Sequence, residues 1–149
     1  MSDNNIWSDE WGEQGEDWSG GGVLAKRLPR APERPGLGAT VYELDPGDFV
    51  VYHFHHGMEE LLVVLRGRPV LRTPEGERAL EEGESVYFPL GPAGAHGLRN
   101  DTGDLVRVLF ASTITSPEVC EYPDTGQITA QSRHDSQKGE RLFVIHDLD

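Results

Sequence analysis

The chain has little cysteine, few basic residues and no long apolar run, and each deficit excludes a class of protein. Cys120 is the single cysteine among 149 residues, which rules out an internal disulfide and fits a reducing compartment. Lys and Arg number 13 against 26 Asp and Glu, and the net charge of −13 repels the phosphates of nucleic acids and anionic membranes. No apolar run could span a bilayer, and residues 1–20 lack the pattern of a signal peptide. We therefore expect a cytoplasmic protein that binds neither nucleic acid nor membrane.

Sustained helical periodicity is also absent, because no segment keeps an apolar period of about 3.6 residues over several turns. Between Leu37 and Ser112, short apolar or alternating runs are separated by Gly, Pro and Asp turn signals, mostly at a spacing of roughly 8–12 residues. This spacing is typical of antiparallel sandwiches and barrels. We predict an all-β core with strands at residues 38–44, 49–55, 60–65, 69–73, 78–80, 85–88, 96–100 and 105–112, and a last strand at 141–148.

Composition divides the chain into three parts. Residues 1–22 are an acidic arm with three tryptophans and no Lys or Arg. Its charge favours disorder, whereas its large apolar rings favour docking, and both interpretations stay open. Residues 23–115 form the predicted barrel. Residues 116–149 are a C-terminal extension, which we expect to be polar and irregular before its last strand and to pack on the barrel or on a partner subunit.

A histidine-rich stretch, YHFHHGMEELLVVLRG, is the strongest chemical signal in the chain. Side chains alternate between the faces of a strand, so His53 and His55 can address one ion from the same face. His56 has the opposite parity and stands beside a turn glycine, so we expect it to face solvent. Parity does not choose between Glu59 and Glu60, because the residues after each are apolar on both faces of the strand.

The same parity places Val50, Tyr52 and Phe54 on the outward face of their strand. Together with the run ELLVVL, which is apolar on both faces, this row favours burial against a second subunit. We therefore expect a homodimer.

A fourth candidate ligand, His96, follows a Pro/Gly-rich loop and begins a predicted strand. Three imidazoles and one carboxylate suit a divalent transition metal such as iron, manganese, nickel, copper or zinc better than calcium or magnesium. Four protein ligands would leave two positions of a six-coordinate ion open for substrate or water.

These residues resemble the cupin superfamily. Its first motif runs Gly, five residues, His-x-His, three or four residues, Glu, six residues, Gly, and is matched by Gly47, His53, His55, Glu60 and Gly67. The count back from the last glycine therefore selects Glu60 over the glutamate before it.

The second cupin motif is matched by Gly83, Pro89, Gly91, His96 and Asn100. The gap before its histidine is four residues here, against the usual two. All flanking counts are kept, so the departure indicates a longer loop rather than a lost ligand.

The resemblance implies a double-stranded β-helix (jelly-roll barrel) with N- and C-terminal arms, and frequent homodimers. It also implies a metal in the wider mouth of the barrel, held by His53, His55, Glu60 and His96. The segments GRPVLRTPEGER, FPLGPAGAHGLRN and SPEVCEYPDTG have counterparts in a subgroup of small single-domain cupins without a settled activity. The fold by itself implies no reaction.

Two functions stay open: a metal-dependent isomerase, decarboxylase, dioxygenase or hydrolase, and a non-catalytic metal or small-molecule binding module. A divalent ion with one carboxylate ligand keeps a positive charge, so we expect an anionic or polyhydroxylated small molecule as the ligand.

Tyr87, Arg72 and Arg107 are candidates to face the cavity, although packing outside the barrel is the simpler expectation for each. Cys120 lies among acids that raise a thiol pKa, which disfavours a nucleophile. His134 and His146 are expected to be ordinary surface residues.

Overall fold

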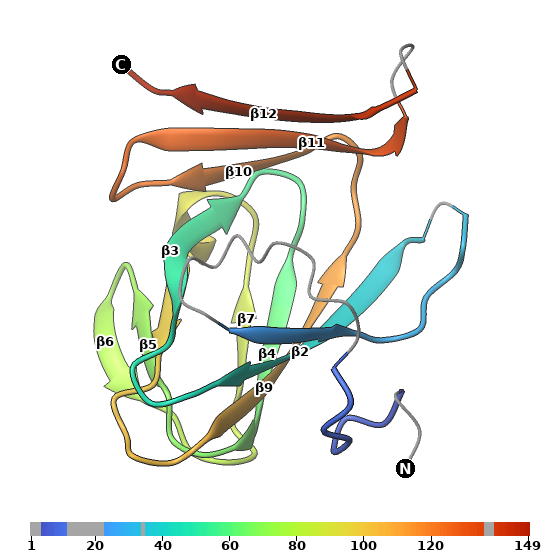
Figure 1. Cartoon of the computed structure of the whole chain (residues 1–149). Coiled ribbons are helices and arrows are strands. Elements are labelled where there is room, and N and C mark those ends of the chain that lie inside the picture. Colours follow the sequence, from blue (N-terminus) through green and yellow to red (C-terminus); the bar gives the residue numbers. More distant parts are fainter. Residues whose placement is uncertain (1–3, 12–22, 34, 136–138) are drawn as a thin grey trace.

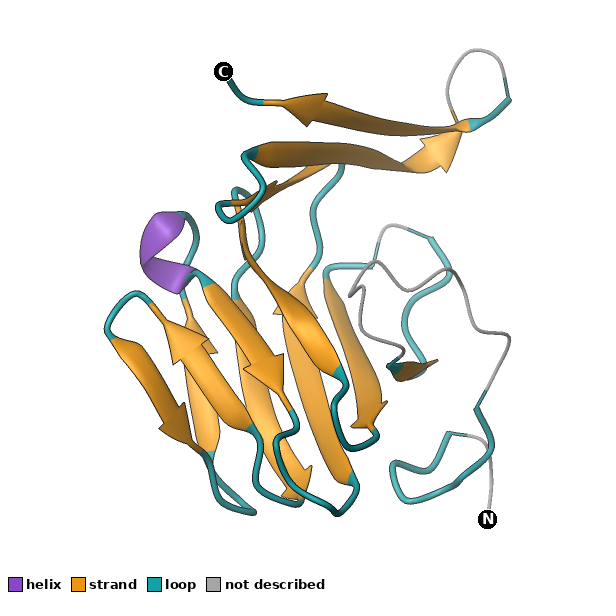
Figure 2. Cartoon of the chain, turned by 60° about the vertical axis from the view of Figure 1, so that its left-hand side comes forward, coloured by secondary structure: helices purple, strands orange, loops and turns teal. Residues whose placement is uncertain are grey.

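The computed structural model describes residues 4–11, 23–33, 35–135 and 139–149. Two antiparallel sheets face each other, and the only helical element in these ranges is a single 3-10 turn, η1 (Pro92–Gly94) (Figure 2). No helix within them is long and apolar enough to cross a membrane. The fold is thus the all-β jelly-roll barrel that the sequence predicts.

The smaller sheet has five strands. In spatial order they are β1 (Leu24–Arg27), β2 (Leu37–Leu44), β9 (Val106–Thr113), β4 (Glu60–Arg66) and β7 (Ser85–Phe88).

The larger sheet has seven strands. In spatial order they are β12 (Arg141–Asp147), β11 (Gln127–Asp135), β10 (Glu118–Tyr122), β3 (Phe49–His55), β8 (His96–Arg99), β5 (Val70–Thr73) and β6 (Gly76–Ala79) (Figure 1).

The core lies between the two sheets, and strand β4 shows how the sequence defines it. Leu62 and Val64 are almost fully buried and join the core cluster, whereas Leu61 on the other face is 41% exposed. By alternation, Glu60 belongs to the inward face with Leu62 and Val64. The β4 strand ends at Gly67, whose φ of 84° and close approach to the Leu105 carbonyl leave no room for a side chain.

Strand β3 departs from simple alternation. Its pairing with β8 shifts register between Val50 and His53, and such a bulge changes which face a residue presents. Val50 packs against the core cluster, so the predicted outward row Val50, Tyr52 and Phe54 is wrong at Val50, whereas Phe54 is buried outside that cluster. Tyr52 stacks under the Arg72 guanidinium, 3.9 Å from its ring centroid.

The C-terminal extension is more ordered than its composition suggests. The expectation of an irregular segment before the last strand is wrong, because β10 and β11 lie within it. Strand β10 pairs with β3 and brings Cys120 opposite His55. Strands β11 and β12 continue the sheet past the end of the barrel (Figure 1).

The described part of the N-terminal arm, residues 4–11, lies against the barrel. The Lys26 ammonium donates a hydrogen bond to the Ser8 carbonyl at 2.7 Å, and Arg107 forms an ion pair with Asp9. Lys26 and Arg107 also approach the face of the Trp11 ring. Docking thus holds for this stretch, whereas Trp18 lies outside the described residues.

Candidate metal centre

The sequence predicts four metal ligands, and three strands bring them together inside the barrel. His53 and His55 come from β3, Glu60 begins β4 in the opposite sheet, and His96 begins β8, where it pairs with His53. The His55 and His96 Nε2 atoms lie 2.8 Å and 3.3 Å from the Glu60 Oε1 atom. The His53 ring lies 4.9 Å from that of His55 and 4.6 Å from that of His96.

Each histidine uses its Nδ1 atom for a structural contact, which leaves Nε2 as the donor for an ion. The His53 Nδ1 atom lies 2.6 Å from the Val51 carbonyl oxygen, and the His96 Nδ1 atom lies 2.8 Å from the Gly94 carbonyl oxygen. The His55 Nδ1 atom contacts the Glu118 carboxylate. Contacts of this kind fix the tautomer and orient an imidazole for metal binding.

The lengthened loop before His96 forms the η1 turn and keeps the ring inside the barrel. A side chain at Gly94 would meet the Pro89 carbonyl oxygen at 1.8 Å, so only glycine fits this tight approach. The His96 ring stacks on Phe88 with centroids 3.8 Å apart, and the residue is only 1% exposed. The two extra residues therefore fold outside the cluster and do not displace the ring.

Three buried polar atoms of the cluster, His55 Nε2, Glu60 Oε1 and His96 Nε2, have no hydrogen-bond partner outside the cluster among the described residues. They face one another, because both nitrogen atoms lie close to the same carboxylate oxygen. The donor atoms of His53, Glu60 and His96 lie within 4.8 Å of one another, as a shared ion requires. Nitrogen and carboxylate donors in this number fit a divalent transition metal.

The cluster contains histidines in different protonation states. Burial, with the neighbouring His96 and His55, lowers the pKa of His53 to about 3, so its imidazole is neutral. Burial opposes charge on His55 as well, but the Glu118 and Glu60 carboxylates outweigh it and raise the pKa of His55 to about 10. Burial likewise opposes charge on Glu60, yet His55 and His96 hold its pKa well below the usual range. The centre therefore pairs an ionised Glu60 with a protonated His55, and a divalent cation bound there would replace the His55 proton as the positive partner.

Sequence reasoning missed two residues beside this cluster, Glu118 and Cys120 on β10. Glu118 is 3% exposed, contacts His55 and accepts a hydrogen bond from the Gln131 amide at 3.2 Å. The Cys120 sulfur lies within 4.8 Å of donor atoms of His53 and His55, and burial raises the pKa of its thiol to about 12. Alternation in EVCEY was the available signal, because it puts Glu118 and Cys120 on one face.

The residues set aside by the sequence analysis lie outside the cluster. His56 is paired with Glu121 at 3.0 Å and its side chain is 48% exposed. Glu59 accepts a hydrogen bond from the exposed Tyr87 hydroxyl at 2.6 Å. His146 lies on the exposed strand β12, and the side chain of His134 is not among those described.

The two arginine candidates, Arg72 and Arg107, also form their ion pairs outside the cluster. Arg72 forms a bidentate ion pair with Asp124 on the surface. Arg107 is 4% exposed and is held between Glu43 and Asp9, under the N-terminal arm. Neither arginine lines the cavity that contains the cluster.

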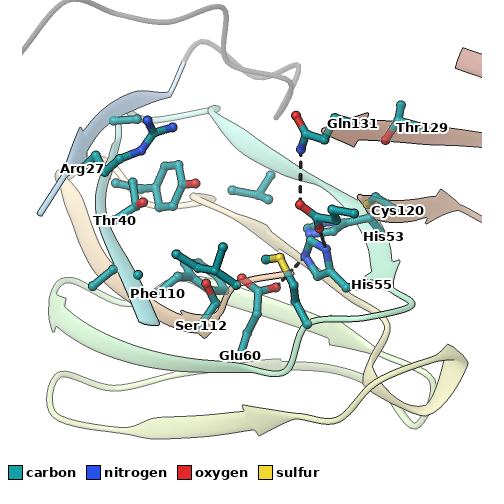
Figure 3. A pocket seen from close by; sticks show the side chains of 18 of the residues that line it. Arg27, Thr40, His53, His55, Glu60, Phe110, Ser112, Cys120, Thr129 and Gln131 are labelled. Atoms are coloured by element: carbon teal, nitrogen blue, oxygen red, sulfur yellow. Dashed lines mark hydrogen bonds and ion pairs between the residues drawn. The ribbon is translucent and has the colours of Figure 1, made fainter. Parts of the chain in front are cut away.

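The cavity has a volume of about 670 Å³ and opens between the two sheets (Figure 3). His53, His55 and Glu60 of the cluster line it, together with Met58 and Phe110, whereas His96 is not among the lining residues. Half of the remaining lining residues bear hydroxyl, amide or guanidinium groups: Arg27, Arg30, Thr40, Tyr42, Ser112, Tyr122, Thr129, Gln131, Ser132 and Arg141.

A two-sheeted β-helix with a His/Glu cluster in its mouth defines a barrel protein able to hold a metal. Residues 40–112 match the family model described as Cupin domain. The chain belongs to the cupin superfamily. A comparison with curated proteins finds no similar sequence.

Solved structures of other cupins share this fold. A sugar phosphate isomerase of the cupin superfamily from Silicibacter pomeroyi DSS-3 has a TM-score of 0.72 and 25% identity, over 85% of this chain and 76% of that one. A protein from Acidithiobacillus ferrooxidans, provisionally assigned as a sugar phosphate isomerase, has a TM-score of 0.67 and 26% identity, over 82% and 75%. A Cupin 2 conserved barrel domain protein from Salinispora arenicola, at 22% identity and a TM-score of 0.53, covers 63% of this chain and 77% of its own, and shows the fold alone.

Proposed function

We propose that the protein is a metal-dependent isomerase of a small, sugar-like hydroxy-carbonyl compound. The observation that carries the proposal is the set of buried atoms of His55, Glu60 and His96 that converge on one another and have no partner outside the cluster in the described chain. A divalent transition metal would satisfy all three at once, with His53 as a further ligand. Bound there, the ion would supply Lewis-acid polarisation of a carbonyl or hydroxyl oxygen.

The cavity supports a polyhydroxylated substrate. Thr40, Ser112 and Gln131 line it and offer donors and acceptors that match sugar hydroxyls. Phe88 and Phe110 flank the His96 ring and exclude water from that side of the cluster. Glu118 fixes the His55 ring, so the geometry of the cluster is set before a substrate arrives.

Isomerisation is the reaction that these features favour. It moves one hydrogen between adjacent carbons and one between their oxygens, and it consumes no oxidant. Two structures that are 25% and 26% identical to this chain, each matched over more than four fifths of it, bear descriptions of isomerases of phosphorylated sugars.

The first test is elemental analysis of protein purified without added metal. We expect near-stoichiometric iron, manganese, nickel or zinc, and a loss of most of it in His53→Ala and Glu60→Ala. His56→Ala is the matched control, because His56 is exposed and should leave the metal in place. Equal loss in the control would refute the assignment of the ligands.

The second test is conversion. The metal-loaded protein is incubated with aldose and ketose pairs, free and phosphorylated, and their interconversion is followed by NMR. Activity that disappears in Glu60→Ala supports the isomerase. Stoichiometric metal without conversion of any pair would instead favour a non-catalytic binding module.

A further inference from the structure

The cavity has two chemically different ends. Figure 3 shows His53, His55 and Glu60 on one side and Arg27 and Thr40 on the other. Glu60 and Glu118 are the only carboxylates in the described lining, and both are in contact with His55. The arginine end therefore has no acidic lining residue to neutralise it.

Three separate segments supply arginines to this lining. Arg27 is the last residue of β1, Arg30 follows in the next loop, and Arg141 is the first residue of β12. The whole chain has only 13 Lys and Arg and a net charge of −13. Three arginines around one cavity are therefore a local concentration of positive charge on an acidic protein. A positively charged rim on an acidic protein concentrates anions at that place.

Arg27 and Arg141 are available for a ligand. In the parts of the chain that the structure describes, the side chain of neither residue has a hydrogen bond or an ion pair. Three arginines outside the cavity are engaged instead: Arg72, Arg99 and Arg107 each hold carboxylates through at least two nitrogen atoms. A guanidinium presents parallel N–H donors that match the oxygens of a phosphate group.

We infer that Arg27 and Arg141, which line the same cavity, form a subsite for the phosphate group of the substrate. The inference rests on the proposed function and extends it: the substrate is a phosphorylated sugar. Its hydroxy-carbonyl end lies at the His/Glu cluster, and its phosphate lies at the arginine end of the cavity. A phosphate monoester carries nearly two negative charges at neutral pH, enough to engage two arginines, whereas a neutral sugar gains nothing from them.

The test is calorimetric titration of the protein as purified with glucose 6-phosphate, glucose and inorganic phosphate. Wild type is compared with Arg27→Gln/Arg141→Gln. Arg68→Gln is the matched control, because Arg68 is exposed, pairs only with Glu81 and lies outside the cavity. We expect the double variant to bind glucose 6-phosphate and inorganic phosphate at least about tenfold more weakly, with unchanged metal content and unchanged glucose binding. The control should match wild type.

Unchanged affinity for both phosphates in the double variant overturns the subsite, as does equal affinity of wild type for glucose and glucose 6-phosphate. These failures differ from failure of the proposed function. A wild type that contains no metal, or that converts no sugar, refutes the isomerase, and the arginine variants still decide whether the arginine end of the cavity binds phosphate.

Discussion

At the scale of single residues, the centre depends on side chains that orient other side chains. His55 can offer Nε2 to an ion because Glu118 occupies its Nδ1 atom, and Gln131 in turn holds Glu118. Glu118 lies 63 positions from His55 in the chain, so no local pattern relates the two. Their contact matters because a carboxylate behind a ligating histidine raises its basicity and fixes its tautomer.

We predict that Glu118→Gln retains the fold but binds metal roughly 10–100-fold more weakly, since an amide is a poorer partner for the imidazole. Glu121→Gln is the matched control, because Glu121 lies on the same strand and pairs only with the exposed His56. Competition with a chelator of known affinity measures both variants. Equal affinity in the two variants would remove Glu118 from the centre.

At the scale of elements, the turn η1 decides whether the second motif delivers its histidine. The loop is longer than the cupin pattern requires, yet the spare residues curl into a single 3-10 turn and His96 still begins β8 opposite His53. The packing of Gly94 on Pro89 fixes this turn, and the Gly94 carbonyl then orients the His96 ring.

We predict that Gly94→Ala lowers thermal stability by about 1–3 kcal/mol and reduces metal content, because the added methyl group collides with backbone. Gly103→Ala is the control, since a side chain there meets nothing within 4 Å. Thermal unfolding and elemental analysis of the two variants provide the measurement. If Gly94→Ala matched the control in both respects, the turn would not position His96.

At the scale of the whole molecule, strand β12 is the exposed edge of the larger sheet. Its apolar residues Leu142, Phe143, Val144 and Ile145 are 41–48% exposed, on both faces of the strand. An apolar edge of this kind, with backbone groups directed outward, is a template for pairing with another chain. The expected homodimer is therefore better explained by pairing through β12 than by the predicted outward row on β3.

We predict that the protein is a dimer at micromolar concentration and that Val144→Asp/Ile145→Asp makes it a monomer, because buried carboxylates disfavour the interface. Leu37→Asp, an exposed apolar position on β2, is the control and should remain dimeric. Light scattering coupled to size exclusion distinguishes the two states. A monomeric wild type would contradict the prediction.

The sequence by itself determined the features that depend on residues close together in the chain. Alternation and turn spacing predicted the barrel, and motif counts singled out Glu60 from Glu59 and kept His96 in the set. The face of Glu60, the contact of Glu118 and Cys120 with the histidines, and the approach of Arg27 to the cavity were decided only by tertiary structure. Each depends on pairing between segments far apart in the chain, as when β10 joins β3, and such pairing is set by the packing of the whole sheet.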